Sequence, residues 1–113
     1  MKSISTHVLD ISRGRPAEGV PVTLEKKDLS GGYAPVHAGR TDADGRVKGL
    51  VAEGTLTAGT YRITFDTGAY FAALDVEAFY PEASVVFVIR DAEAHYHVPL
   101  LLSAFGYSTY RGS

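Results

Sequence analysis

Four histidines are the side chains in this sequence best suited to acid–base chemistry, because an imidazole titrates near neutral pH. They are His7, His37, His95 and His97. His95 and His97 stand two positions apart, so on a strand both side chains would leave the same face. Such a pair binds a metal ion only where a third ligand meets it, and the sequence has no cysteine and no His-Glu-x-x-His motif. From spacing alone, these histidines are more typical of polar strand positions than of a metal site.

Arg40 is a further candidate for site chemistry. It follows Gly39 near the end of an expected strand, where a side chain can reach the mouth of a pocket, although most isolated arginines on strands are solvated. The acidic segment at 42–45 faintly resembles a calcium loop, but it lacks the third acidic position and the glutamate at position twelve. We therefore expect a tight turn at 42–45.

The elements that must position these residues are short strands. Alternating or β-branched segments, separated by Gly, Pro and Asp, predict an antiparallel β-sandwich over the whole chain, 1–113, as a single domain. Residues 67–74 have helical spacing, with Asp66 or Thr67 as a cap, and predict one short helix. The apolar segment 85–89 predicts a strand buried on both faces or at a subunit contact. The strands are expected at 4–9, 20–27, 33–41, 60–66, 85–89, 95–103 and 104–110, with 46–51 as a candidate for an eighth.

Composition excludes several classes of partner. Eleven basic and thirteen acidic residues give a formal charge of −2, which argues against nucleic acid and against an anionic membrane surface. No stretch approaches the about 20 apolar residues of a membrane helix. The N-terminus lacks the apolar run and cleavage site of a signal peptide, and the C-terminus is not a peroxisomal tripeptide. A cytoplasmic protein is therefore expected.

The C-terminal segment is unusually apolar for the end of a chain, where residues are normally polar. One sandwich cannot easily cover residues 97–107, so an interface between subunits is the natural place for them. The last four residues, Tyr110, Arg111, Gly112 and Ser113, then add a phenol, a guanidinium and a carboxylate. From the residues alone, this is an oligomer interface with a polar tail.

Taken together, several segments resemble the transthyretin-related 5-hydroxyisourate hydrolases. The tail YRGS is highly specific to these enzymes, and the motifs occur in the right order over nearly the whole chain. One departure is Ala104, where the family usually has proline, and we expect this to change local backbone rigidity without abolishing function. The matching segments are THVLD at 6–10, GRPA at 14–17, GRT at 39–41, DGR at 44–46, YP at 80–81, HYHVPLLLS at 95–103 and YSTYRGS at 107–113.

The resemblance implies a transthyretin-like β-sandwich of two four-stranded sheets with one short helix. It also implies a homotetramer, a dimer of dimers, whose active sites lie in a central channel at the dimer–dimer interface. The family's catalytic residues fall on His7, Arg40 and His97. The expected substrate contacts add the tail to these three: Tyr110, Arg111, Gly112 and Ser113.

The implied reaction is hydrolysis of 5-hydroxyisourate to 2-oxo-4-hydroxy-4-carboxy-5-ureidoimidazoline in urate catabolism, by ring opening at an acyl C–N bond. His7 and His97 are expected to activate water and transfer protons, and Arg40 to stabilise negative charge. Tyr110 would line the pocket, and Arg111 and the terminal carboxylate would orient the histidines. No metal or organic cofactor is expected. Two alternatives remain: a non-catalytic small-ligand carrier of the transthyretin fold, and a β-sandwich interaction module of a larger secreted protein.

Overall fold

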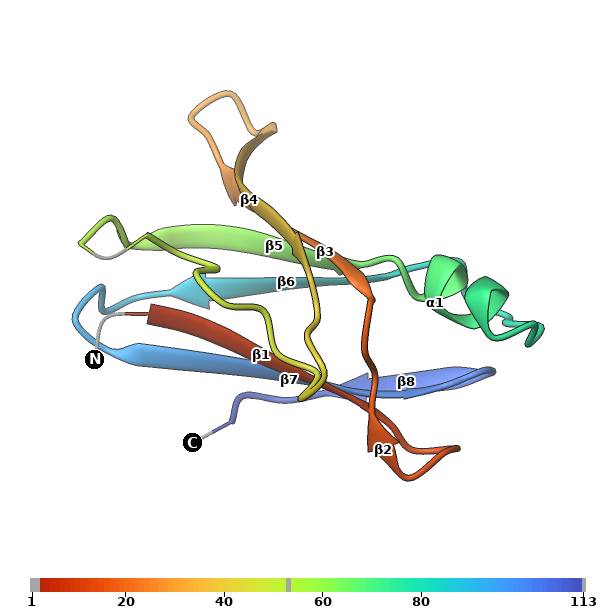
Figure 1. The fold of residues 1–113 in the computed structure, drawn as a ribbon. Helices are drawn as coiled ribbons and strands as arrows, with labels where there is room; N and C mark the ends of the chain where they lie inside the picture. The colour runs from red at the N-terminus through yellow and green to blue at the C-terminus, as the bar shows by residue number, and fades with distance from the viewer. Residues whose placement is uncertain (1–2, 53, 113) are drawn as a thin grey trace.

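The computed structural model describes residues 3–52 and 54–112. Two four-stranded sheets lie face to face, in the strand orders β2-β1-β7-β8 (the first sheet) and β4-β3-β5-β6 (the second sheet) (Figure 1). The expected sandwich of two four-stranded sheets with one short helix is confirmed. The elements are β1 (Ser3–Asp10), β2 (Arg15–Pro16), β3 (Pro21–Lys27), β4 (Tyr33–Arg40), β5 (Gly59–Phe65), α1 (Thr67–Ala73), β6 (Ala83–Ile89), β7 (His95–Ser103) and β8 (Gly106–Thr109).

The first sheet is mixed rather than wholly antiparallel, because β1 runs parallel to β7. Their register sets Ser5 opposite His97 and His7 opposite Pro99. Parallel strands need a long crossover, and here the whole second sheet lies between the two strands in chain order. This pairing places residues from the two ends of the chain side by side.

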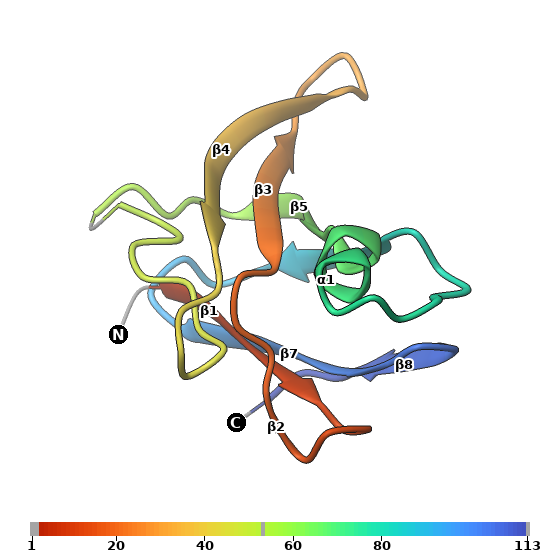
Figure 2. The ribbon, with the colours of Figure 1, turned by 45° about the vertical axis from the view of Figure 1, so that its right-hand side comes forward.

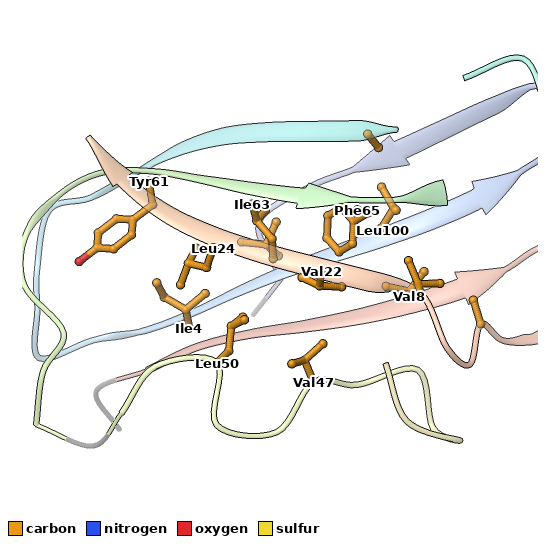
Figure 3. Packing of buried hydrophobic residues seen from close by; sticks show 14 of the residues in the cluster. Ile4, Val8, Val22, Leu24, Val47, Leu50, Tyr61, Ile63, Phe65 and Leu100 are labelled. Carbon is orange, nitrogen blue, oxygen red and sulfur yellow. The ribbon is translucent and has the colours of Figure 1, made fainter. Parts of the chain in front are cut away.

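Apolar side chains from both sheets meet in one core between them (Figure 3). In β1 the side chains alternate, with Ile4 and Val8 buried and their neighbours half-buried on the other face. Val47 and Leu50, from the loop after β4, pack against the same core. The described helical residues form no segment with the length and apolar character needed to span a membrane.

The loop between β4 and β5 connects the two sheets in space. Beyond β4 the chain descends from the second sheet to the first and passes beside β1, as Figures 1 and 2 both show. The backbone N–H of Val8 donates to the carbonyl of Gly45 at 2.8 Å, which fixes the loop to β1. The loop therefore delivers its own side chains to the first sheet.

Two local expectations differ from the structure. Residues 46–51 form no strand, because after an isolated bridge at Arg46 the chain turns again at Gly49, whose φ is +67°. β6 is an edge strand in which Val86 and Val88 are 56% and 46% exposed, so burial on both faces is not met within one chain. The helix cap is confirmed, since the Asp66 carboxylate accepts the N–H of residue 69 at 3.0 Å.

Candidate active site

Three of the four histidines lie on the outer face of the first sheet. Val8 is fully buried beside His7, and Tyr96 is buried between His95 and His97. Because neighbouring side chains on a strand point to opposite faces, the three imidazoles leave the face that points away from the core. The parallel pairing of β1 with β7 then brings His7 into the neighbourhood of His97.

Arg46 joins these histidines, although sequence reasoning did not select it. It forms an isolated bridge with His7, directly after Gly45. A Cβ atom on Gly45 would lie 2.4 Å from the Val8 carbonyl oxygen, and the φ of Gly45 is +77°, so only glycine fits this close approach. The signal available in the sequence was the DGR motif at 44–46: a tight turn ending on a glycine, with a cation immediately after it.

The C-terminal tail reaches the same site through Gly112. Its backbone N–H donates to the His97 carbonyl at 2.8 Å. A Cβ atom on Gly112 would lie 2.4 Å from Cδ2 and 3.0 Å from Cγ of His97, so the glycine backbone packs directly against the imidazole. Ser113, the remaining tail residue of the sequence prediction, lies outside the described residues.

The environment of His97 favours its neutral form. The ring nitrogen Nδ1 lies 2.7 Å from the Ser5 hydroxyl. Burial lowers the pKa of His97 below its ordinary value of 6.5, and the positive charge of Arg46 lowers it further, followed by His95 and His7. His97 is therefore suited to accept a proton at neutral pH.

The structure does not bring Arg40 to the histidines within one protomer. Arg40 ends β4 and donates to the Gly19 carbonyl at 3.2 Å. It lines a different hollow, of about 510 Å³, together with Arg13, Arg15 and Tyr70 of α1. A catalytic role for Arg40 stays a prediction.

Tyr110 and Arg111 also point away from the histidines within one protomer. Both line a smaller hollow of about 200 Å³ between the edges of the two sheets, beside Phe87. The Arg111 guanidinium stacks on the ring of Tyr96 at 4.5 Å, on the core side of β7. Of the described tail residues, Gly112 is the one that contacts a predicted catalytic side chain.

His37 lies apart from the other histidines, half-buried on β4 in the second sheet, where it lines a hollow with Arg62 and Glu82. Across residues 3–52 and 54–112, no group of three or more His, Cys, Asp or Glu side chains is placed to hold a metal ion.

The outer face of the first sheet offers imidazole and guanidinium groups. These can withdraw a proton from water and stabilise negative charge on a carbonyl oxygen.

Comparison with known proteins identifies relatives over nearly the whole chain. A 5-hydroxyisourate hydrolase of Salmonella dublin is 49% identical over 110 residues, which cover 97% of this chain and 80% of that protein. A probable 5-hydroxyisourate hydrolase of Caenorhabditis elegans is 50% identical over 111 residues, covering 98% of this chain and 81% of that protein. These relatives confirm the prediction of an enzyme, a hydrolase.

Solved structures confirm the transthyretin-like sandwich. The 5-hydroxyisourate hydrolase of Klebsiella pneumoniae superposes with a TM-score of 0.85 at 42% identity, covering 97% of this chain and 92% of that one. Transthyretin of Sparus aurata superposes with a TM-score of 0.93 at 34% identity, covering 99% and 97%. Residues 4–112 match the model of the HIUase/Transthyretin family. The chain is therefore a member of the HIUase/Transthyretin family.

Proposed function

We propose that this chain hydrolyses 5-hydroxyisourate to 2-oxo-4-hydroxy-4-carboxy-5-ureidoimidazoline. The observation that carries the proposal is the gathering of His7, Arg46 and Gly112 around His97 on the outer face of the first sheet. The names of the relatives supply the substrate. The proposal extends to a single hydrolase domain over residues 1–113, and the expected cytoplasmic location stays a prediction.

His97 is the proposed base. Because burial and Arg46 lower its pKa, the imidazole is neutral at pH 7 and can take a proton from the attacking water. The water oxygen bonds to the acyl carbon of the substrate ring, the C–N bond breaks, and the leaving nitrogen takes a proton. His7, on the neighbouring strand, is the proposed donor of that proton.

Arg46 is the proposed cation that stabilises the developing oxyanion. The backbone of Arg46 forms a β-bridge with His7, and its positive charge lowers the pKa of His97. Within one protomer, Arg40 instead donates to the Gly19 carbonyl. A guanidinium suits this task because it is planar and stays charged at all relevant pH values. The family resemblance implied this role for Arg40, and the position of Arg46 beside His7 and His97 supports Arg46 instead.

Assembly into a homotetramer, a dimer of dimers, is part of the proposal. β6 and β8 each end a sheet, and exposed edge strands invite pairing with a second copy. Large apolar side chains are exposed on and near these edges, including Val86 at 56%, Phe105 at 66% and Tyr110 at 59%. In the assembly, Tyr110, Arg111 and Ser113 would complete the substrate contacts. Sedimentation velocity at the assay concentration reports the oligomeric state. A chain that sediments as a monomer and still has full activity would overturn the proposed tetramer.

The two arginines separate the competing site assignments. Freshly generated 5-hydroxyisourate would be followed by its ultraviolet decay with wild type, Arg46→Gln and Arg40→Gln. Arg46→Gln should lower kcat by about 100-fold or more, the scale of a lost charge-stabilising group, while Arg40→Gln should lower it far less. The reverse order would return the role to Arg40.

The same assay tests the alternative of a non-catalytic small-ligand carrier, because the chain also superposes on a transthyretin. Faster decay in the presence of the protein supports the hydrolase. Binding of a small ligand without any acceleration would favour a carrier and overturn the proposed function.

A further inference from the structure

A continuous row of hydrogen-bonding side chains runs along the outer face of the first sheet behind His97. It alternates between the two parallel strands β1 and β7, whose register pairs Ser3 with His95 and Ser5 with His97. The Ser3 hydroxyl lies 2.5 Å from Nδ1 of His95. The Ser5 hydroxyl lies 3.0 Å from Nε2 of His95 and 2.7 Å from Nδ1 of His97. Ser5 therefore joins the two imidazoles.

The number of protons on these groups determines which one donates each hydrogen bond in this row. A serine hydroxyl has one proton, so Ser5 can donate to one imidazole and must accept from the other. If Nε2 of His97 is the base, it carries a lone pair, and Nδ1 of His97 carries the ring proton and donates to Ser5. Ser5 then donates to Nε2 of His95, and Nδ1 of His95 donates to Ser3. Each link has one donor and one acceptor, so the arrangement is self-consistent.

Electrostatics gives the row a purpose. Burial and the charge of Arg46 lower the pKa of His97, with smaller effects in the same direction from His95 and His7, while a backbone contact with Ser5 acts weakly in the opposite direction. A positive charge that stays on His97 after proton abstraction is therefore unfavourable. A second imidazole, 6.5 Å away between ring centroids and reachable through one hydroxyl, is an alternative location for that charge.

We infer that Ser5 and His95 form a proton relay behind His97. When Nε2 of His97 takes a proton from water, the Nδ1 proton of His97 moves to Ser5 Oγ, and the Ser5 proton moves to Nε2 of His95. His97 has gained one proton and lost one, so it stays neutral, and Ser5 is unchanged. His95 becomes the imidazolium, with its Nδ1–H still donated to Ser3. After His7 has given its proton to the leaving nitrogen, the relay runs in reverse, and Nε2–H of His97 passes its proton to His7, so that every group regains its starting protonation.

This inference rests on the proposed hydrolysis, so its first test is independent of turnover. Nitrogen-15 NMR of the imidazoles in the full chain reports which ring nitrogen carries the proton. The relay predicts that neutral His97 is protonated at Nδ1 in the wild type. A His97 protonated at Nε2 in the resting protein would overturn the relay without touching the proposed function.

A matched pair of variants tests the relay in the reaction. Ser5→Thr keeps the hydroxyl and Ser5→Val has nearly the same shape without it, and both side chains suit a strand. Ser5→Val should lower kcat by about 10- to 100-fold with little change in KM, on the scale of a weakened acid–base group, and Ser5→Thr should retain most of the activity. Equal rates for the two variants, with the wild type active, would overturn the relay alone. An inactive wild type would instead overturn the proposed function.

A double variant separates a relay from a purely structural role. His95→Gln can still hydrogen-bond to the hydroxyl of Ser5 but cannot carry the proton. Because members of one relay act as a unit, Ser5→Val combined with His95→Gln should be no slower than the slower single variant. Losses that multiply would show two independent effects and would contradict the relay. Unchanged melting temperatures of all variants exclude unfolding as the cause.

Discussion

Replacing Gly112 with alanine would place a methyl group against the imidazole of His97. The new Cβ would lie 2.4 Å from Cδ2 of His97, whereas carbon atoms in ordinary contact lie about 3.5–4.0 Å apart. The imidazole or the tail must therefore move by roughly 1 Å or more, and a displacement of that size at a reacting group costs on the order of 100-fold in rate. A 100-fold loss corresponds to about 2.7 kcal/mol of transition-state stabilisation.

The assay is kcat for 5-hydroxyisourate, measured beside the melting temperature. Gly112 lies outside the hydrophobic core, so the melting temperature should barely change while kcat falls. Gly106→Ala is the matched control, since the nearest atom to its new Cβ would be the Ser103 hydroxyl at 3.8 Å. Wild-type kcat in Gly112→Ala would refute the reasoning that the tail fixes His97.

Two further predictions follow from the same geometry. Because the neutral form of His97 is the active one, kcat/KM should rise with pH through a midpoint below 6.5. Arg46→Gln should move that midpoint upward, because it removes one cause of the lowered pKa of His97. A midpoint that does not move would contradict the electrostatic effect of Arg46 on His97. Gly45→Ala meets the Val8 carbonyl, whereas Gly49→Ala has a similar positive φ with no atom within 4 Å. Gly49→Ala should therefore lower the free energy of unfolding by about 1 kcal/mol. Gly45→Ala should lower it clearly more and should also reduce kcat. Equal losses of unfolding free energy, measured by urea unfolding, would contradict the close packing of the loop after β4 against β1.

Alternation along the strands was enough to predict which faces the histidines take. The sequence placed His95 on the same strand face as His97, and the structure confirms this placement. This is a local property of an extended chain with a period of two. The short helix and its Asp66 cap were likewise readable from local signals.

The partners of the histidines could not be predicted in the same way. Ser5 meets His97 only because β1 pairs in parallel with β7, across a separation of 92 residues. The choice between Arg40 and Arg46 depends on the path of the loop after β4, which no local pattern specifies. The contact of Gly112 with His97 depends on the tail folding back along β7.

The decay of freshly generated 5-hydroxyisourate, followed with the wild-type chain and with His97→Gln, tests both the proposed hydrolysis and the role of His97 as its base. We expect the wild type to accelerate the decay and His97→Gln to lower kcat by about 100-fold or more, the scale of a lost general base, while the fold stays intact. If the wild type makes the decay no faster than it is in buffer, the proposed hydrolysis is contradicted. If His97→Gln has an undiminished kcat, the role of His97 as the base is contradicted.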